Sequence, residues 1–265
     1  MNRNYLIVGN PVEHSLSPKI HNFWFNKNNI SATYKKETLS ESKLENLVKR
    51  IKKGDISGVN VTVPFKQKII PFLDKLSDLA KKTQSVNTLY KEDDLVIGDN
   101  TDVYGFSQSI LNHNISLKNK DALIIGAGGV VPSVITALED LSIRKIYIKN
   151  RTQEKLLKLK EIFNNINPLE WDQEIDCNIV INATSLGLNP DDKLDLNFDN
   201  LKDEIIFYDT IYNPPMTNFL KNAKEKGHII INGKSMLLLQ AQKAFEIWTG
   251  IKPKIDEKFL NYLDD

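Results

Sequence analysis

A glycine-rich run in the middle of the chain carries the clearest binding chemistry in the sequence. It follows a short apolar stretch, opens a helical pattern, and reads Gly126-Ala127-Gly128-Gly129-Val130. Glycines let the backbone turn tightly and approach a pyrophosphate, while the N–H groups and dipole of the following helix receive its negative charge. The alternative is an ordinary glycine-rich turn. The context favours a dinucleotide-binding loop, although Val131 stands where the usual pattern has a small residue.

The next predicted strand discriminates between two dinucleotides. An NAD site usually has an acidic residue about 20 residues after the glycines, where it binds the ribose hydroxyls. Here the strand ends in Asn150-Arg151-Thr152, and Lys155 follows within one helical turn. A guanidinium, a hydroxyl and an ammonium can bind a 2′-phosphate, and a solvated basic helix start is the alternative. The sequence therefore predicts NADP as the cofactor.

Two hydroxyls lie just before the first predicted helix. Ser15 and Ser17 can converge on a carboxylate, and the helix N-terminus adds favourable potential there. Ser17, followed by Pro18, is also explained as a helix N-cap with proline at the first helical position. That explanation accounts less well for Ser15, so the pair indicates an anion-binding loop.

A lysine and an aspartate follow other predicted elements. Lys66 lies just past a β-branched run, at the end of a strand where ligands collect in open α/β sheets, but a lone lysine is more often a solvated surface charge. Asp102 ends the run Asn100-Thr101-Asp102, and alone it is most simply an N-cap for a helix that begins at Val103. Residue types by themselves leave both roles open.

The elements that would position these groups are apolar runs alternating with helical patterns along the chain. This alternation predicts parallel strand pairing and an α/β doubly wound fold. We expect two open α/β domains, a substrate domain and a Rossmann-type NADP-binding domain, with the C-terminal helices returning to the first. Their expected bounds are 1–101 plus 235–265 and 102–234. The predicted strands are 5–8, 58–63, 86–90 with 95–97 as a hairpin, 121–125, 145–149, 178–183, 205–209 and 228–231. The predicted helices are 17–27, 44–53, 129–141, 152–163, 233–248 and 256–263.

Composition excludes several classes of function. The 265 residues include 35 basic and 34 acidic side chains, so the net charge of +1 indicates neither nucleic-acid nor membrane-surface binding. One cysteine, Cys177, excludes an internal disulfide and fits a reducing cytoplasm, and four scattered histidines predict no metal site. No run is long enough for a signal peptide or a spanning helix. We expect a cytoplasmic monomer or homodimer whose partners are small molecules.

Taken in order, the motifs resemble the shikimate/quinate dehydrogenase family, specifically its NADP-dependent shikimate dehydrogenases. The resemblance covers nearly the whole chain. It is carried by G-N-P-V-E-H-S-L-S-P-K-I-H-N (9–22), G-V-N-V-T-V-P-F-K (58–66), S-V-N-T-L (85–89), N-T-D (100–102), G-A-G-G (126–129), N-R-T (150–152), N-A-T-S-L-G (182–187), D-T-I-Y-N-P-P-M-T (209–217) and N-G-K-S-M-L-L-L-Q-A (232–241).

The resemblance implies a reaction, the reversible NADPH-dependent reduction of 3-dehydroshikimate to shikimate in aromatic amino acid biosynthesis. It also implies a role for each matching position. Ser15 and Ser17 match serines that hold the substrate carboxylate, and Lys66 and Asp102 match the catalytic pair, which also contacts the substrate. The positions that match groups contacting the substrate's hydroxyls and ring are Thr62, Asn87 and Gln240.

Further positions match the family's cofactor site. These are the glycine loop, the 150–152 turn, Lys155, and a set that lines the nicotinamide side of the cleft: Tyr212, Gly233 and Met236. The sequence departs from the family at Val103, where a glycine is usual, at Val130-Val131-Pro132, where small residues are usual, and at Lys155, where arginine is commoner.

The implied chemistry suits these residue types. Carbonyl reduction needs a hydride from one face and a proton at the developing alkoxide, and a protonated lysine both stabilises that charge and donates the proton. We therefore expect Lys66 to be the acid/base and Asp102 to orient it, with no metal. Two alternatives stay open. One is a relative that accepts quinate and uses NAD, against which the basic 150–152 turn argues. The other is a non-catalytic NADP-binding regulator, against which the presence of both Lys66 and Asp102 argues.

Overall fold

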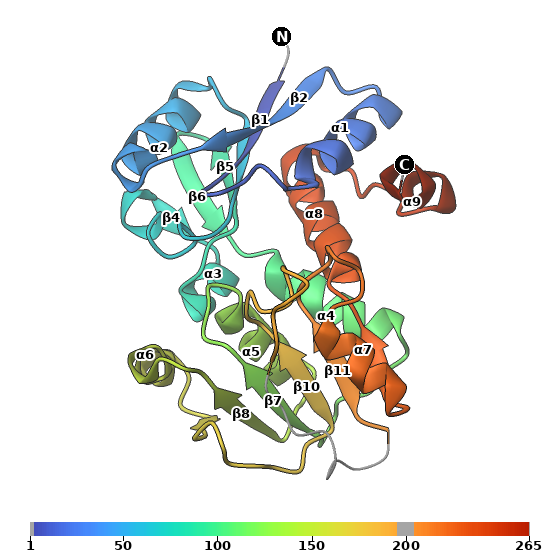
Figure 1. Ribbon diagram of the computed structural model, residues 1–265. Helices are drawn as coiled ribbons and strands as arrows, with labels where there is room; N and C mark the ends of the chain where they lie inside the picture. The colour runs from blue at the N-terminus through green and yellow to red at the C-terminus, as the bar shows by residue number, and fades with distance from the viewer. Residues whose placement is uncertain (1–2, 195–203, 265) are drawn as a thin grey trace. The chain divides into compact units, whose positions relative to one another are not determined.

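The chain divides into two compact units, and each has its own six-stranded sheet. The computed structural model describes residues 3–194 and 204–264 (Figure 1). The first unit comprises Met1–Gly105 and Leu238–Asp265, and the second comprises Phe106–Leu237. The C-terminal helices therefore belong to the first unit, as the fold prediction expected.

The first unit has a mixed sheet with strand order β2-β1-β3-β5-β6-β4. β2, β1 and β3 are parallel, whereas β5 pairs antiparallel with both β3 and β6. The predicted hairpin is confirmed as β5 and β6, although its first strand begins at residue 88 instead of 86. The strands are β1 (Arg3–Gly9), β2 (Ala32–Thr38), β3 (Gly58–Val61), β4 (Lys75–Leu76), β5 (Thr88–Glu92) and β6 (Leu95–Asp99).

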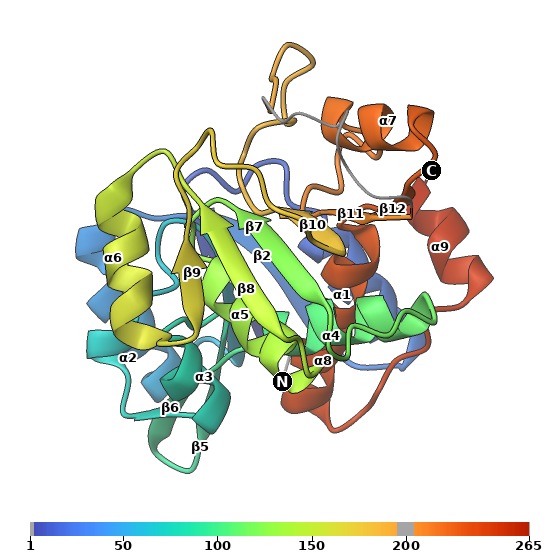
Figure 2. The ribbon, with the colours of Figure 1, turned by 90° about the horizontal axis from the view of Figure 1, so that it is seen from below.

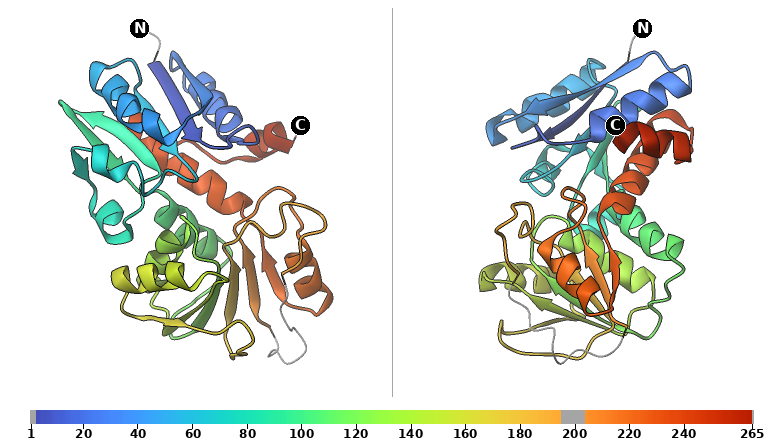
Figure 3. Two further views of the ribbon diagram at one scale, coloured as in Figure 1. Left: turned by 60° about the vertical axis from the view of Figure 1, so that its left-hand side comes forward. Right: turned by 45° about the vertical axis from the view of Figure 1, so that its right-hand side comes forward.

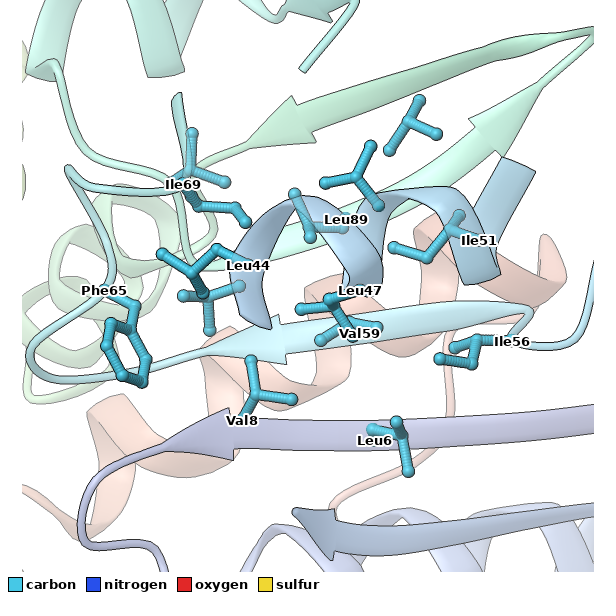
Figure 4. Packing of buried hydrophobic residues seen from close by; sticks show 14 of the residues in the cluster. Leu6, Val8, Leu44, Leu47, Ile51, Ile56, Val59, Phe65, Ile69 and Leu89 are labelled. Carbon is cyan, nitrogen blue, oxygen red and sulfur yellow. The ribbon is translucent and has the colours of Figure 1, made fainter. Parts of the chain in front are cut away.

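Helices cover both faces of this sheet because successive side chains of β1 alternate between them. Leu6 and Val8 belong to a core cluster with α2 (Leu44–Lys53), whose apolar residues recur at helical spacing (Figure 4). Gly54, at φ 83°, ends α2 in the left-handed conformation that glycine tolerates best. On the opposite face Tyr5 stacks on Phe25 with ring centroids 4.9 Å apart. The other helical elements are α1 (Ser17–Lys27), η1 (Glu41–Lys43), η2 (Ile70–Phe72), α3 (Asp78–Thr83), α8 (Lys234–Thr249) and α9 (Glu257–Asp264).

The start of α1 differs from the sequence prediction. Ser17 is the first residue of the helix, Pro18 lies in its first turn, and Leu16 occupies the cap position without a side-chain hydrogen bond. Ser17 is therefore not the N-cap. Its hydroxyl stays available for other partners.

The second unit has an all-parallel sheet with strand order β12-β11-β10-β7-β8-β9. Counted from β7, this is the order 3-2-1-4-5-6 of a Rossmann fold, and its topological switch point lies between β7 and β10. Figures 2 and 3 show α5 and α7 on opposite faces of this sheet. The elements are α4 (Asp102–Asn112), β7 (Asp121–Ile125), α5 (Val131–Asp140), β8 (Lys145–Lys149), α6 (Gln153–Ile162), β9 (Ile166–Pro168), β10 (Ile179–Asn182), β11 (Ile206–Asp209), α7 (Asn218–Glu225) and β12 (Ile229–Ile231).

No helix in the described ranges combines the length and apolarity that crossing a membrane would need.

An aromatic cluster beneath α1 contains a histidine with unpaired nitrogens. His21 is fully buried, stacks on Tyr34 with centroids 4.5 Å apart, and has no hydrogen-bond partner at either ring nitrogen within the described residues. Burial lowers the pKa of His21 to about 3 from its usual 6.5, because the apolar surroundings disfavour the imidazolium.

This histidine makes the first unit sensitive to acid. Between pH 6.5 and 3, His21 is protonated in the unfolded chain but stays neutral in the folded one. The free energy of unfolding therefore decreases as the pH falls below about 6.5. We expect His21→Leu, which cannot titrate, to lose about 3 kcal/mol less than the wild type between pH 6.5 and pH 4. Urea unfolding at the two pH values measures this difference. Equal losses in the two proteins would contradict the prediction.

Candidate active site

An ion pair in the first unit joins the two residues expected to be catalytic. Lys66 Nζ lies 2.6 Å from Asp102 Oδ2, and the two side chains are 12% and 8% exposed. The Lys66 carbonyl accepts a hydrogen bond of 2.8 Å from the Val86 N–H, which fixes the backbone that carries the ammonium. The ion pair is mostly buried but still slightly accessible, so a bound molecule could reach the ammonium and receive a proton from it.

The N-terminus of α4 places Asp102, and it does so differently from the simplest sequence interpretation. Asn100 Oδ1 accepts hydrogen bonds from the N–H groups of Asp102 (3.0 Å) and Val103 (3.2 Å). Asn100 therefore caps the helix, and the interpretation of Asp102 as the N-cap is wrong. The Asp102 carboxylate is left free to meet Lys66.

One predicted substrate residue contacts the same carboxylate, and a second contacts the first. The Asn87 amide nitrogen donates to Asp102 Oδ1 (2.9 Å) and approaches Gln240 Oε1 at 3.4 Å. The two carboxylate oxygens thus have separate partners, Asn87 and Lys66. Structure brings together four of the predicted residues, from the segment after β3, the turn before β5, α4 and α8.

The predicted anion-binding loop leaves the sheet beside the segment that carries Lys66. β1 and β3 are adjacent and parallel, so the residues that follow them lie at one sheet edge. The Asn10 N–H donates to the Val63 carbonyl (3.0 Å), and a Cβ on Gly9 would come within 2.4 Å of Thr62 Cγ2. Thr62 is half-buried, and its backbone N–H donates to the Val8 carbonyl at 2.9 Å.

The two serines of this loop touch one another. Ser15 Oγ donates to Ser17 Oγ at 3.2 Å and accepts a hydrogen bond of the same length from the Ser17 N–H. Ser15 is half-buried and Ser17 is buried. Two adjacent hydroxyls can turn their protons toward one carboxylate, which only accepts hydrogen bonds.

Sequence reasoning missed two polar residues beneath the serines. The buried Tyr34 hydroxyl donates to Asn60 Oδ1 (2.7 Å) and hydrogen-bonds Ser17, while Asn60 Nδ2 donates to the Asn87 carbonyl at 3.1 Å. Asn60 could have been found, since a buried strand rarely holds an amide without reason. Tyr34 lies in a polar stretch that gives no such signal.

The glycine loop of the second unit follows β7 at the switch point. Gly126 has φ 113°, and a Cβ there would lie 2.8 Å from the Ala183 carbonyl oxygen, so only glycine fits. Gly128 is exposed, and Ala127, Gly129 and Val130 are half-buried. α5 begins directly after Val130 without a side-chain cap, which leaves its N-terminus suited to a phosphate.

The basic turn after β8 presents charge to solvent. Arg151 and Lys155 are exposed, and neither has an ion-pair partner in the described part of the chain. Thr152 occupies the N-cap of α6 without a side-chain cap hydrogen bond, and the Asn150 amide braces the turn by donating to the Thr152 carbonyl at 2.8 Å. The donor set is suited to a phosphate monoester.

A buried carboxylate organises the loop that carries Tyr212. Asp209 accepts hydrogen bonds from Thr217 Oγ1 (2.6 Å), Ile211 N (3.0 Å) and Asn182 Nδ2 (3.1 Å). Burial raises the pKa of Asp209, and the three hydrogen bonds oppose that rise. The carboxylate therefore ties together the ends of β10 and β11. Tyr212 is half-buried in the loop that follows.

The turn before α8 closes against the same loop. The Gly233 N–H donates to the Ile211 carbonyl (2.9 Å), and a Cβ on Gly233 would lie 2.2 Å from the Thr210 carbonyl oxygen. Glycine is required here because the backbones touch. Met236 is buried one turn later. These residues belong to the second unit, whereas the Lys66–Asp102 pair belongs to the first.

The residues from 3 to 194 and 204 to 264 contain no group of three or more His, Cys, Asp or Glu side chains that could hold a metal ion.

Comparison with known proteins gives consistent matches for both units. Residues 7–89 match the family described as the shikimate dehydrogenase substrate binding domain, and residues 107–187 match shikimate / quinate 5-dehydrogenase. A protein of Pelagibacter ubique named shikimate dehydrogenase (NADP(+)) is 52% identical over 264 residues, which covers 100% of both chains.

Solved structures that are similar to this chain carry the same family name. The crystal structure of shikimate dehydrogenase from Aquifex aeolicus has a TM-score of 0.92 and 35% identity, and the match covers 100% of this chain and 98% of that one. The Thermus thermophilus shikimate 5-dehydrogenase in complex with NADP(H) and shikimate has a TM-score of 0.88 and 30% identity, with 99% and 97% covered.

Proposed function

The chain belongs to the shikimate dehydrogenase family, and we propose that Lys66 and Asp102 carry its reversible, NADPH-dependent reduction of 3-dehydroshikimate to shikimate. It is an NADP-dependent oxidoreductase of aromatic amino acid biosynthesis. The observation that supports this assignment best is the nearly buried pair, with Lys66 Nζ 2.6 Å from Asp102 Oδ2 and Asn87 on the other carboxylate oxygen.

The mechanism needs one proton at one oxygen. When bound, NADPH would supply a hydride to the substrate's carbonyl carbon, and the π electron pair of that carbonyl would move to its oxygen. The Lys66 ammonium stabilises the resulting negative charge and donates its proton there, leaving a neutral amine. In the oxidation direction the same nitrogen takes the hydroxyl proton. Asp102 holds the ammonium in place throughout.

In this proposal the other predicted site residues of the first unit bind the substrate. Ser15 and Ser17 donate to its carboxylate, while Thr62, Asn87 and Gln240 contact its hydroxyls and ring. In this proposal the first unit, predicted as residues 1–101 plus 235–265, is the substrate domain, and the second, predicted as residues 102–234, is the NADP-binding domain. The two units divide a few residues later than predicted, after Gly105 and after Leu237. We further propose cytoplasmic monomers or homodimers with small molecules as partners.

The second unit has residues that fit the cofactor. The glycine-only position at Gly126, the accessible backbone of residues 127–130 and the uncapped N-terminus of α5 suit a pyrophosphate. Arg151, Thr152 and Lys155 suit a 2′-phosphate, with Asn150 bracing their turn. Tyr212, Gly233 and Met236 would line the nicotinamide side.

Absorbance at the reduced-nicotinamide band tests the proposal. With the protein, NADP and shikimate as the only components, we expect absorbance to rise with time. Parallel reactions with NAD and with quinate should be much slower, and comparable rates there would favour the quinate-accepting, NAD-using alternative. Saturable NADP binding without turnover of either acid would contradict the assignment and support a regulator.

A further inference from the structure

Asn100 is a buried amide that the proposed mechanism does not use, and its side chain joins the start of α4, which carries Asp102, to the segment that leads to Asn87. The residue is 1% exposed. One end, Oδ1, accepts from the N–H groups of Asp102 and Val103 at the start of α4. The other end, Nδ2, donates to the Ser85 carbonyl at 2.9 Å and to Thr83 Oγ1 at 3.2 Å.

The hydrogen bond from Asn100 Nδ2 to the Ser85 carbonyl connects Asn100 to the segment 85–87, which contacts both Lys66 and Asp102. Ser85 precedes Val86, whose N–H holds the Lys66 carbonyl at 2.8 Å. The next residue is Asn87, whose amide donates to Asp102 Oδ1. A single side chain therefore links the backbone positions of Lys66, Asn87 and Asp102.

The hydrogen bonds from the start of α4 to Asn100 Oδ1 determine which partner the Asp102 carboxylate can take. The first N–H groups of a helix have no partner within it, and an aspartate at the helix start is among the side chains most able to satisfy them. Asn100 already occupies the N–H groups of Asp102 and Val103. Without that cap, the Asp102 carboxylate has an alternative to its ion pair, namely hydrogen bonds to the uncapped N–H groups in the first turn of its own helix.

We propose that Asn100 is a positioning residue for the catalytic pair, which keeps the Asp102 carboxylate on Lys66 by capping α4 in its place. This inference rests on the proposed function of the pair. It predicts that Asn100→Ala lowers kcat on the order of 10- to 100-fold, the scale of a small misplacement of reacting groups. KM for NADP stays near the wild-type value, because the hydrogen bonds described for the Asn100 side chain go to the first unit, whereas the residues proposed to bind the cofactor belong to the second.

A double-mutant cycle separates positioning from a general loss of structure. Asn100→Ala is measured in the wild type and in Asp102→Asn, with folding followed by circular dichroism. If Asn100 acts through Asp102, its replacement lowers kcat much less in the Asp102→Asn background. An equal fold-loss in both backgrounds, or an unchanged kcat in the first, overturns the inference.

Two further variants complete the experiment. Asp256→Ala removes another side-chain cap in the same unit, since Asp256 Oδ1 accepts from Phe259 N at 3.0 Å at the start of α9. It also removes the ion pair with Lys27, and kcat should not change. Asn100→Ser keeps a capping oxygen without the amide, and gives a smaller loss that can be measured even if the alanine variant does not fold. Wild-type turnover combined with full kcat in the Asn100 variants rejects this inference and leaves the proposed function standing, whereas an inactive wild type rejects both.

Discussion

Replacing Lys66 with alanine is expected to lower kcat by ~10²-fold or more and to leave the affinity for NADPH almost unchanged. The ammonium has two tasks in the transition state, stabilising the alkoxide and giving it a proton. Neither task exists before the substrate reacts, so the loss falls on kcat more than on binding. Lys66 belongs to the first unit, whereas the residues proposed to bind the dinucleotide belong to the second.

A matched control is available two residues away. Lys68 carries the same charge on the same segment, is 46% exposed and pairs with Glu41, so Lys68→Ala should retain kcat. Steady-state rates give kcat, and fluorescence of bound NADPH gives its dissociation constant. Turnover by Lys66→Ala comparable with that of the wild type would remove Lys66 from the mechanism. Weakened NADPH binding would instead indicate that the substitution disturbs more than proton transfer.

The sequence predicted most of the second sheet because its strands are buried on both faces. In β7 all residues from Asp121 to Ile125 are buried, so the strand appears as an apolar run with predicted bounds that the structure confirms. β2 has the opposite character. It lies at a sheet edge, only Tyr34 is buried, and its lysines, glutamate and threonines give no apolar period. Its place is set by seven parallel pairs with β1, which no local pattern contains.

The same distinction explains what could be predicted of the candidate site. Residue types and motif order identified Lys66, Asp102, Asn87 and Gln240, and the structure places their polar atoms in contact. The role of Asn100 could not be predicted, because capping of α4 by Asn100 and by Asp102 are equally good local explanations. Only the fold decides, since it brings Ser85 to the Asn100 amide.

The basic turn after β8 gives the second large prediction. Arg151→Ala is expected to lower kcat/KM for NADP about 10- to 100-fold and to leave kcat/KM for NAD nearly unchanged, because NAD lacks the 2′-phosphate. The estimate follows from charge-assisted hydrogen bonds of about 1.5–3 kcal/mol, with each 1.4 kcal/mol worth about tenfold. Arg151 has no protein carboxylate partner in the described ranges, so its removal should leave folding intact.

This prediction is tested by cofactor preference, measured as the ratio of kcat/KM for NADP to kcat/KM for NAD. Lys155→Ala should reduce the ratio of the two kcat/KM values less than Arg151→Ala, because an ammonium lacks the fork that binds a phosphate through two parallel hydrogen bonds. Lys160→Ala removes the same charge from the last turn of α6 and should leave the ratio unchanged. A ratio that Arg151→Ala also leaves unchanged would mean that the turn is only a solvated helix start. The choice of NADP would then have to come from residues elsewhere in the second unit.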